Sequence, residues 1–450
     1  MSDAGVANLH WAYTLLDGLA ASGVNRVVLS PGSRSTPLAL AGELHPSIQT
    51  WAQVDERCAA FFALGMARAT QTPVALVATS GSAPTHWHPA VIEADQAGIP
   101  LLLLSADRPP ELQNCGANQT INQTHLFQGA TRAFHALPVA EQEQDSLDYV
   151  RSLAIQAVHQ SCWPLPGPVQ INVPFREPLV PERISRLTPT ATAVPVEQPV
   201  LTPPDSQLDR VAEHLSGRPG LIIAGPGPFP ACFAASLVRL AERLNCPVIA
   251  DPLSGLRCGD HDRSRVLCHY DAFLRRQSFT ASHQPEWVLR FGMMPVSKAL
   301  FRYLQSLKSG QLFLVDPFGR WPDPLHRTGD VLRATPHAVC EGLTERIAHA
   351  ASSTWCEAFS HEEQRAARLM NDMTEMKQCL EAQVVNSLVQ TLPPNSVLFA
   401  GNSLPIRELD SFSGSQAKPL QLIANRGAAA SMARYPLCLA LPAPWMKTPP

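Results

Sequence analysis

Charged residues are scarce in this chain, and several targeting features are missing. Only 16% of its 450 residues are Asp, Glu, Lys or Arg, and the formal net charge is −3. A balance this close to neutral gives no reason to expect nucleic acid or an anionic membrane surface as a partner. No apolar run is long enough to cross a bilayer, and no basic stretch followed by an apolar core opens the chain. We therefore expect neither a membrane protein nor a signal peptide.

Paired cysteines are also missing. The chain has 11 cysteines, an odd number, and no two of them form a C-x-x-C pair. This pattern argues against a zinc ribbon and against the disulfide framework of a small secreted domain. A reducing, cytoplasmic location is the expectation that follows.

What the chain does contain is an alternation of short apolar strands and amphipathic helices. Such an alternation predicts an α/β fold with parallel sheets flanked by helices. The strands expected in the first part of the chain are Arg26–Ser30, Trp51–Val54, Val74–Ala78, Leu101–Leu104 and Val169–Val173.

Composition divides the chain into pieces. Residues 1–185 form a first α/β domain, and the stretch 186–204, rich in proline and threonine, is expected to be a linker. A second α/β pattern covers 205–350. Residues 351–450 begin with a helical connection and open a third unit at Val397–Ala400, which is too short for a complete domain of this kind.

Polar clusters follow the predicted strands of the first domain. In open parallel sheets, ligands bind beyond the carboxyl ends of the strands, beside helix N-termini. We therefore expect a binding site where these clusters meet: Pro31–Ser35, Asp55–Arg57, Thr79–Gly81, Asp107–Glu111 and Asn114–Gln119.

Three of these clusters also have a structural explanation. Asp55 suits a helix N-cap, and Glu56 can be a carboxylate favoured by the helix dipole. Ser33-Arg34 can be a cap with a solvated arginine, and Arg108 can belong to a stiff crossover. On their own residues, these alternatives stay open.

Eight ordered sequence blocks resemble one family. They are P-G-S-R-S-T-P-L (31–38), D-E-R (55–57), A-L-G-M-A (63–67), P-V-A-L-V-A-T-S-G (73–81), L-L-S-A-D-R-P-P-E-L (103–112), N-C-G-A-N-Q (114–119), G-N-S-L (401–404) and N-R-G-A (425–428). Together they are similar to MenD, the 2-succinyl-5-enolpyruvyl-6-hydroxy-3-cyclohexene-1-carboxylate synthases of menaquinone biosynthesis. The resemblance implies a three-domain thiamine-diphosphate enzyme, here with an incomplete third domain. It also implies a homodimer or homotetramer whose cofactor sits between subunits.

The resemblance also implies residue roles. Thiamine diphosphate with Mg²⁺ (or Mn²⁺) decarboxylates 2-oxoglutarate, and the resulting succinyl carbanion adds to isochorismate. Glu56 would hydrogen-bond the aminopyrimidine of the cofactor, with Thr79, Ser80 and Gly81 beside it. The substrate site would be lined by Ser33, Arg34, Arg108, Gln119, Lys298, Asn402, Ser403, Arg407 and Arg426.

The chain departs from the family pattern after Arg426. The family continues with S-G-I-D-G and later a loop that holds Mg²⁺ and diphosphate, whereas this chain has Ser431-Met432-Ala433 in a different tail, 429–450. A frameshift or truncation would produce such a tail. We therefore expect no metal ligands in this chain, doubtful cofactor binding and no synthase turnover by this polypeptide alone.

Two other functions remain open at this stage. One is a different thiamine-diphosphate decarboxylase or carboligase, although the arginine-rich loops argue against small neutral substrates. The other is a non-catalytic, truncated homologue that binds a dicarboxylate or a full-length subunit.

Overall fold

The computed structural model describes residues 4–184, 186–374 and 381–428. These residues form two compact units. The first runs to Gln198 and includes the segment from Asn425 to Ala428, and the second runs from Pro199 to Ala424. The boundary at 198/199 falls inside the predicted linker 186–204, and the finer domain limits stay a prediction.

The first unit is built on a six-stranded parallel sheet with the order β2-β1-β3-β4-β6-β5. Its strands are β1 (Arg26–Leu29), β2 (Gln49–Ala52), β3 (Val74–Ala78), β4 (Leu101–Asp107), β5 (Ala133–Ala136) and β6 (Pro168–Pro174). Its helices are α1 (Ala4–Ala21), α2 (Thr36–Leu44), α3 (Glu56–Thr70), α4 (His88–Ala97) and α5 (Gln144–Cys162).

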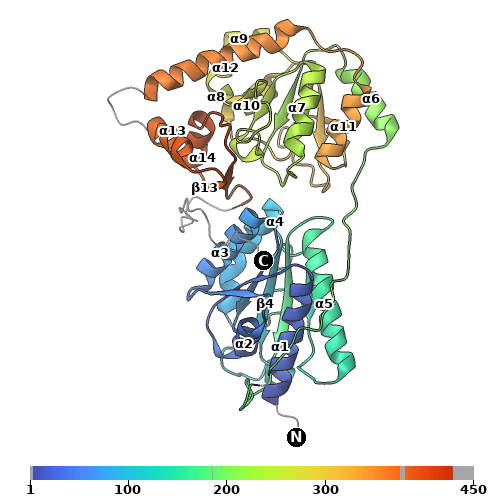
Figure 1. Ribbon diagram of the computed structural model, residues 1–450, viewed down its shortest axis with the longest axis vertical. Coiled ribbons are helices and arrows are strands. Elements are labelled where there is room, and N and C mark those ends of the chain that lie inside the picture. Colours follow the sequence, from blue (N-terminus) through green and yellow to red (C-terminus); the bar gives the residue numbers. More distant parts are fainter. Residues whose placement is uncertain (1–3, 185, 375–380, 429–450) are drawn as a thin grey trace. The chain divides into compact units, whose positions relative to one another are not determined.

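Both faces of this sheet are buried. Alternate residues of β3, such as Ala75 and Val77, pack with α1 and α5, which run side by side in Figure 1. Their neighbours Val74 and Leu76 face the opposite side and pack with α3 and α4. A parallel strand covered on both faces must be apolar throughout, which explains the unbroken run V-A-L-V-A in β3.

The second unit contains another six-stranded parallel sheet, with the order β12-β11-β10-β7-β8-β9. Its strands are β7 (Gly220–Ala224), β8 (Val248–Ala250), β9 (Val266–Leu267), β10 (Trp287–Phe291), β11 (Gln311–Val315) and β12 (Thr328–Leu332). Its helices are α6 (Asp205–Leu215), α7 (Phe233–Leu244), α8 (Tyr270–Phe273), α9 (Gln277–Ser282), α10 (Lys298–Ser306) and α11 (Pro336–Arg346).

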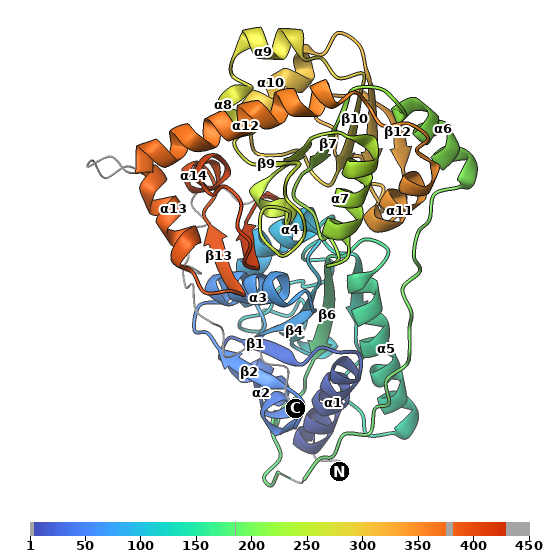
Figure 2. The same ribbon diagram turned by 45° about the horizontal axis from the view of Figure 1, so that its top comes forward.

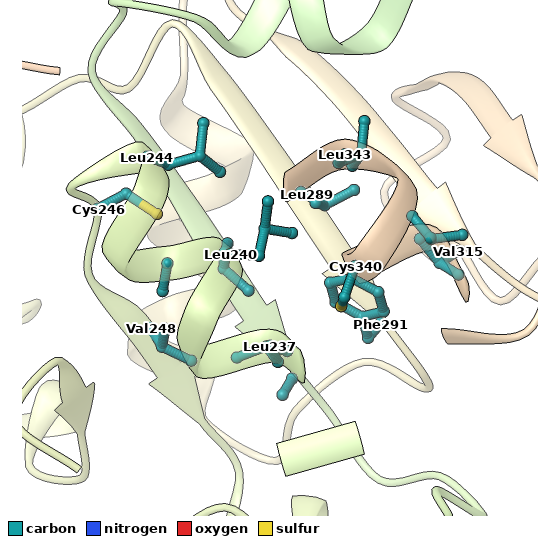
Figure 3. Packing of buried hydrophobic residues seen from close by; sticks show 14 of the residues in the cluster. Leu237, Leu240, Leu244, Cys246, Val248, Leu289, Phe291, Val315, Cys340 and Leu343 are labelled. Atoms are coloured by element: carbon teal, nitrogen blue, oxygen red, sulfur yellow. The ribbon is translucent and has the colours of Figure 1, made fainter. Parts of the chain in front are cut away.

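One face of the second sheet is covered by α7 and α11. In Figure 3, Leu240 of α7 and Leu343 of α11 lie over Leu289 and Phe291 of the central strand β10. Cys340 is packed in this same apolar cluster, and burial raises the pKa of its thiol well above the ordinary value. This cysteine therefore acts as an apolar packing residue, in agreement with the scattered cysteine pattern.

The end of the second unit carries a separate two-stranded parallel sheet, β13 (Ser396–Ala400) and β14 (Leu420–Ala424). The long helix α12 (Ser353–Thr374) crosses the unit beside α8 (Figure 2). Two shorter helices, α13 (Glu381–Thr391) and α14 (Leu404–Phe412), pack with the small sheet in a core of their own. A third, short piece was expected here, and the structure has it.

The predicted fold class is confirmed, and most strand limits agree with the sequence pattern. β3 matches its prediction residue for residue, whereas β4 continues to Asp107, beyond the predicted end at Leu104. The added residues Ser105 and Asp107 are polar but buried, because side chains from β6 hydrogen-bond to them. No helix in the described part of the chain has the length and hydropathy of a membrane span.

A buried ion pair fixes α14 to the second sheet. The Arg257 side chain is fully buried, and its Nη2 lies 2.6 Å from Oδ1 of Asp410 in α14. Its Nε donates to the carbonyl of Ala250 at the end of β8, and Tyr270 donates to the same Asp410 oxygen. Burial raises the pKa of Asp410 to about 7, although the charge of Arg257 opposes this shift.

We expect Arg257→Met to lower the free energy of unfolding by about 3 kcal/mol or more, because it leaves Asp410 buried without its cation. Without Arg257 the pKa of Asp410 rises further above its unfolded value. Between those values the folded variant binds more protons than the unfolded chain, so its stability falls as pH rises. The deficit should therefore be larger at pH 8 than at pH 5.5 in urea denaturation.

Arg239→Met is the matched control. Arg239 forms a long, exposed ion pair of 3.5 Å with Glu341, and its loss should cost at most about 1 kcal/mol. Equal destabilisation by the two substitutions would contradict the assigned role of Arg257.

Candidate functional site

The loops after β1 and β3 touch each other closely. Gly32 precedes a short 3-10 turn, Ser33–Ser35, and a Cβ on Gly32 would lie 2.4 Å from Cβ of Thr79. The backbone N–H of Arg34 donates to Oγ1 of Thr79 at 3.3 Å. The first and third predicted polar clusters are therefore in direct contact, and glycine at position 32 permits that contact.

Three of the predicted site residues are joined by hydrogen bonds. Arg108 donates from Nη1 to Oγ of Ser80 and, at 2.7 Å, to the carbonyl of Gln119. The Gln119 carboxamide in turn donates to the carbonyl of Ser80 at 3.0 Å. Gly81 follows with φ +80°, and a Cβ there would meet the Gln119 side chain at 2.7 Å. The loops after β3 and β4 thus form one continuous surface.

Arg34 is buried, contrary to the picture of a solvated arginine at a helix start. Its Nη1 donates to the carbonyl of Phe175 at 2.9 Å, and its Nη2 lies 2.7 Å from Oε1 of Glu177. The Glu177 side chain is 70% exposed, so the pair has one partner inside the protein and one in solvent. Whether Arg34 also binds substrate stays a prediction.

The positive charges of Arg34 and Arg108 influence each other. Burial lowers the pKa of Arg108, and the charge of Arg34 lowers it further, while Asp107 and Glu177 partly compensate. Burial also raises the pKa of Asp107, against hydrogen bonds from Asn172, Arg108 and Gln113. Two guanidinium groups held this close favour an anionic ligand, because an anion relieves their mutual repulsion.

Glu56 begins α3, as the sequence predicts. Asp55 is the N-cap, and its carboxylate accepts the backbone N–H of Cys58 at 2.8 Å, which lowers the pKa of Asp55. With Asp55 acting as the cap, the Glu56 carboxylate is not needed for that role. It is half-buried, and the preceding Val54 is 87% exposed. Glu56 therefore stands at an accessible helix start.

The second unit holds four other predicted site residues. Asn402 and Ser403 follow β13, and Ser403 has φ +79°, a value that strains a residue other than glycine. Arg407 is exposed one turn into α14. Lys298 is the exposed first residue of α10, after the N-cap Ser297.

Arg426 follows β14 and groups with the first unit. The two residues after it, Gly427 and Ala428, donate their backbone N–H groups to the buried carboxylate of Glu93 in α4. The predicted change of sequence pattern falls on residues 429–450, which lie outside the described residues.

The sequence prediction missed the polar residues beneath these loops. Gln123 and Asn172 are buried, and both join the network that holds Asp107. The available signal was the run V-Q-I-N-V in β6, which places two amides in a strand that is otherwise apolar. Amides in such a strand need buried partners, so they indicate a polar layer inside the sheet.

Comparisons with known proteins agree with the family resemblance. A family model described as "Thiamine pyrophosphate enzyme, N-terminal TPP binding domain" matches residues 10–128, and "Middle domain of thiamine pyrophosphate" matches 198–400. The 2-succinyl-5-enolpyruvyl-6-hydroxy-3-cyclohexene-1-carboxylate synthase of Dechloromonas aromatica is 42% identical over 95% of this chain and 78% of its own length. The chain belongs to this synthase family.

Two further members of the synthase family give similar values. The synthases of Geobacillus kaustophilus and Chloroflexus aurantiacus are each 41% identical over 93% of this chain, covering 73% and 72% of their own lengths. The family is one of thiamine-pyrophosphate enzymes. The N-terminal family model covers β1 to β4 of the first sheet but not β5 and β6, and the middle-domain model covers the whole second sheet.

The residues after β3 are those predicted to lie beside a thiamine cofactor, and this role stays a prediction. Ser80 is fully buried and Thr79 nearly so, and the glycine conformation at Gly81 keeps the loop free of a side chain. A carboxylate at Glu56 suits a hydrogen-bond donor on a heterocycle. No candidate site for a divalent ion is found in the described residues (4–184, 186–374 and 381–428). They contain no group of three His, Cys, Asp or Glu placed to hold one.

We expect Gly81→Ala to disturb the site, because its Cβ would collide with Gln119. Gly116→Ala is the matched control, since Gly116 has a similar φ of +78° but no atom within 4 Å of its would-be Cβ. Both variants should pay about 1 kcal/mol for the left-handed conformation. Only Gly81→Ala should lose a further 1 kcal/mol or more in thermal unfolding. Equal losses would show that Gln119 is not packed on Gly81.

Proposed function

We propose that this chain is a thiamine-diphosphate-dependent synthase subunit of menaquinone biosynthesis. In the proposed reaction, 2-oxoglutarate is decarboxylated and its succinyl unit adds in a 1,4 sense to isochorismate. The products are CO₂ and 2-succinyl-5-enolpyruvyl-6-hydroxy-3-cyclohexene-1-carboxylate. The observation that carries the proposal is the joining of Ser80, Arg108 and Gln119 beside buried Arg34, in a chain 42% identical to such a synthase.

The two substrates explain the basic residues. Isochorismate and 2-oxoglutarate are both dicarboxylates, and guanidinium groups bind carboxylates through paired, charge-assisted hydrogen bonds. Arg108 and Arg34 supply two positive charges in the first unit. The proposed substrate residues that complete the set are Ser33, Gln119, Lys298, Asn402, Ser403, Arg407 and Arg426.

Bound thiamine diphosphate supplies the electron sink that decarboxylation of a 2-oxo acid requires. Glu56 would accept a hydrogen bond from the aminopyrimidine and so hold a proton where the cofactor needs it. Thr79, Ser80 and Gly81 would pack beside the same ring. Mg²⁺ or Mn²⁺ belongs to the proposed cofactor, but no described residue is assigned to it.

The proposed assembly is a homodimer or homotetramer in the cytoplasm. The family resemblance supports the assembly, because its members hold the cofactor between subunits. The accessible position of Glu56 is compatible with that arrangement. The 11 cysteines of the sequence are scattered singly, with no C-x-x-C pair, and this pattern supports a reducing compartment.

The full chain should be tested with 2-oxoglutarate, isochorismate, thiamine diphosphate and Mg²⁺. Product formation supports the proposal and contradicts the expectation of an inactive polypeptide. Calorimetry with isochorismate alone tests the substrate site separately from turnover. If the chain neither binds isochorismate nor forms product under saturating conditions, the proposed function is refuted.

Arg108→Ala should weaken isochorismate binding. Loss of one charge-assisted hydrogen-bonding group costs roughly 1.5–3 kcal/mol, which corresponds to a Kd about 10 to 100 times higher. The measurement is calorimetry without cofactor. Arg210→Ala is the control, because Arg210 is exposed and pairs with Asp330 in the second unit. An unchanged Kd for Arg108→Ala would remove this residue from the site.

Glu56→Gln should separate substrate binding from chemistry. We expect turnover to fall at least about 100-fold, as for the loss of a general acid–base group, while the affinity for isochorismate stays unchanged. Glu182→Gln, at an exposed glutamate of the same unit, should leave both quantities unchanged. Full activity of Glu56→Gln would exclude a catalytic role for this carboxylate.

A further inference from the structure

Gln123 connects the ends of three strands from a buried position. This residue is 1% exposed, and it lies four residues after Gln119 in the segment between β4 and β5. Its Oε1 accepts the backbone N–H of Gly81 at 3.0 Å. Its Nε2 donates to the carbonyl of Ala106 at 3.2 Å and to Oδ1 of Asn172 at 2.7 Å. One carboxamide thus joins the loop after β3 to β4 and β6.

The connection continues to Arg108. Asn172 donates from Nδ2 to Oδ2 of Asp107 at 2.8 Å, and Oδ1 of Asp107 accepts the backbone N–H of Arg108, also at 2.8 Å. Gln123 therefore reaches Arg108 in two ways. One passes through the carbonyl of Ala106, two residues before Arg108, and the other passes through Asn172 and Asp107. Buried side chains inside the sheet therefore hold the backbone at Arg108 in place.

The backbone of Gln123 is also held. Its carbonyl accepts a hydrogen bond from Nε2 of Gln170 at 3.1 Å, and Gln170 is itself fully buried in β6. The same Gln170 amide donates to Oγ of Ser105 at 3.3 Å. Because both the backbone and the side chain are bound, the Gln123 carboxamide has one defined orientation.

We propose that Gln123 is a positioning residue for substrate binding. It keeps the loop after β3, which contains Gly81, and the loop after β4, which contains Arg108, in fixed positions relative to each other. It lies beneath the surface on which Ser80, Arg108 and Gln119 meet and is not itself a proposed substrate contact. The inference rests on the proposed function for the identity of the substrate. The positioning of the two loops is measurable without it.

Glutamine suits this position because the site needs one acceptor and two donors. A glutamate keeps the acceptor for Gly81 but loses the donors to Ala106 and Asn172. A methionine of similar length removes all three groups. Buried polar groups that lose their partners drive the surrounding backbone to find others, so both loops should rearrange.

The first experiment is amide hydrogen exchange on the full chain without ligand. In Gln123→Met, peptides that contain Gly81 and peptides that contain Arg108 should exchange at least about tenfold faster than in wild type. Gln128→Met is the control, because Gln128 is exposed and follows five residues later. Unchanged exchange around Gly81 and Arg108 in Gln123→Met would overturn the proposal.

The second experiment uses Gln123→Glu to distinguish positioning from general destabilisation. This variant should keep the protection of the Gly81 peptide, because the acceptor remains, and should lose protection at Arg108. The Kd of isochorismate should rise about tenfold or more, since small displacements of a binding group are costly. Equal loss of protection in every peptide, with a lower Tm, would assign Gln123 a purely structural role and overturn the proposal.

The outcomes also separate this proposal from the proposed function. If wild-type chain does not bind isochorismate, the proposed function is refuted, and hydrogen exchange still decides whether Gln123 sets the two loops. If wild type binds isochorismate and both Gln123 variants bind it equally well, the synthase proposal stands and the role of Gln123 is refuted.

Discussion

The parallel pairing of β1, β3, β4 and β6 is the constraint on which the first unit depends. Parallel strands end at the same edge of the sheet, so the segments that follow them meet there. In this chain those segments carry the predicted site residues, among them Arg34, Ser80 and Arg108. Neither the contact of Gly32 with Thr79 nor the bonds of Arg108 to Ser80 and Gln119 would exist in an antiparallel arrangement.

Meeting at one edge creates a second requirement, because the loops need support from inside the sheet. Apolar strand ends cannot hold a backbone N–H or a carboxylate in place. The sheet solves this with Ser105, Gln170 and Asn172, which replace apolar residues near the ends of β4 and β6 and bond to one another. A buried polar layer is costly unless its members are bonded, and here hydrogen bonds join all three, although Oε1 of Gln170 has no partner among the described residues.

The sequence predicted the fold class and the meeting of the loops, because both follow from local patterns. Short apolar runs predict buried strands, and the polar clusters after them predict the edge of the sheet at which the loops meet. It did not predict the burial of Arg34, because Glu177 and Phe175 lie more than 140 residues further along the chain. Gln123 was missed for a similar reason: nothing near it in sequence indicates that its partners are Gly81 and Asn172.

The partners of the two arginines also divide their tasks. Arg34 already has a carboxylate partner, Glu177, and a carbonyl partner, so much of its charge is compensated within the protein. Arg108 donates to a hydroxyl and a carbonyl, which carry no negative charge, and its nearby Asp107 is bonded to Asn172. Of these two arginines, Arg108 therefore has the less compensated charge, although Asp107 and Glu177 offset part of it. The proposed substrate carboxylate would therefore gain most by pairing with Arg108, while Arg34 raises the local positive potential from its buried position.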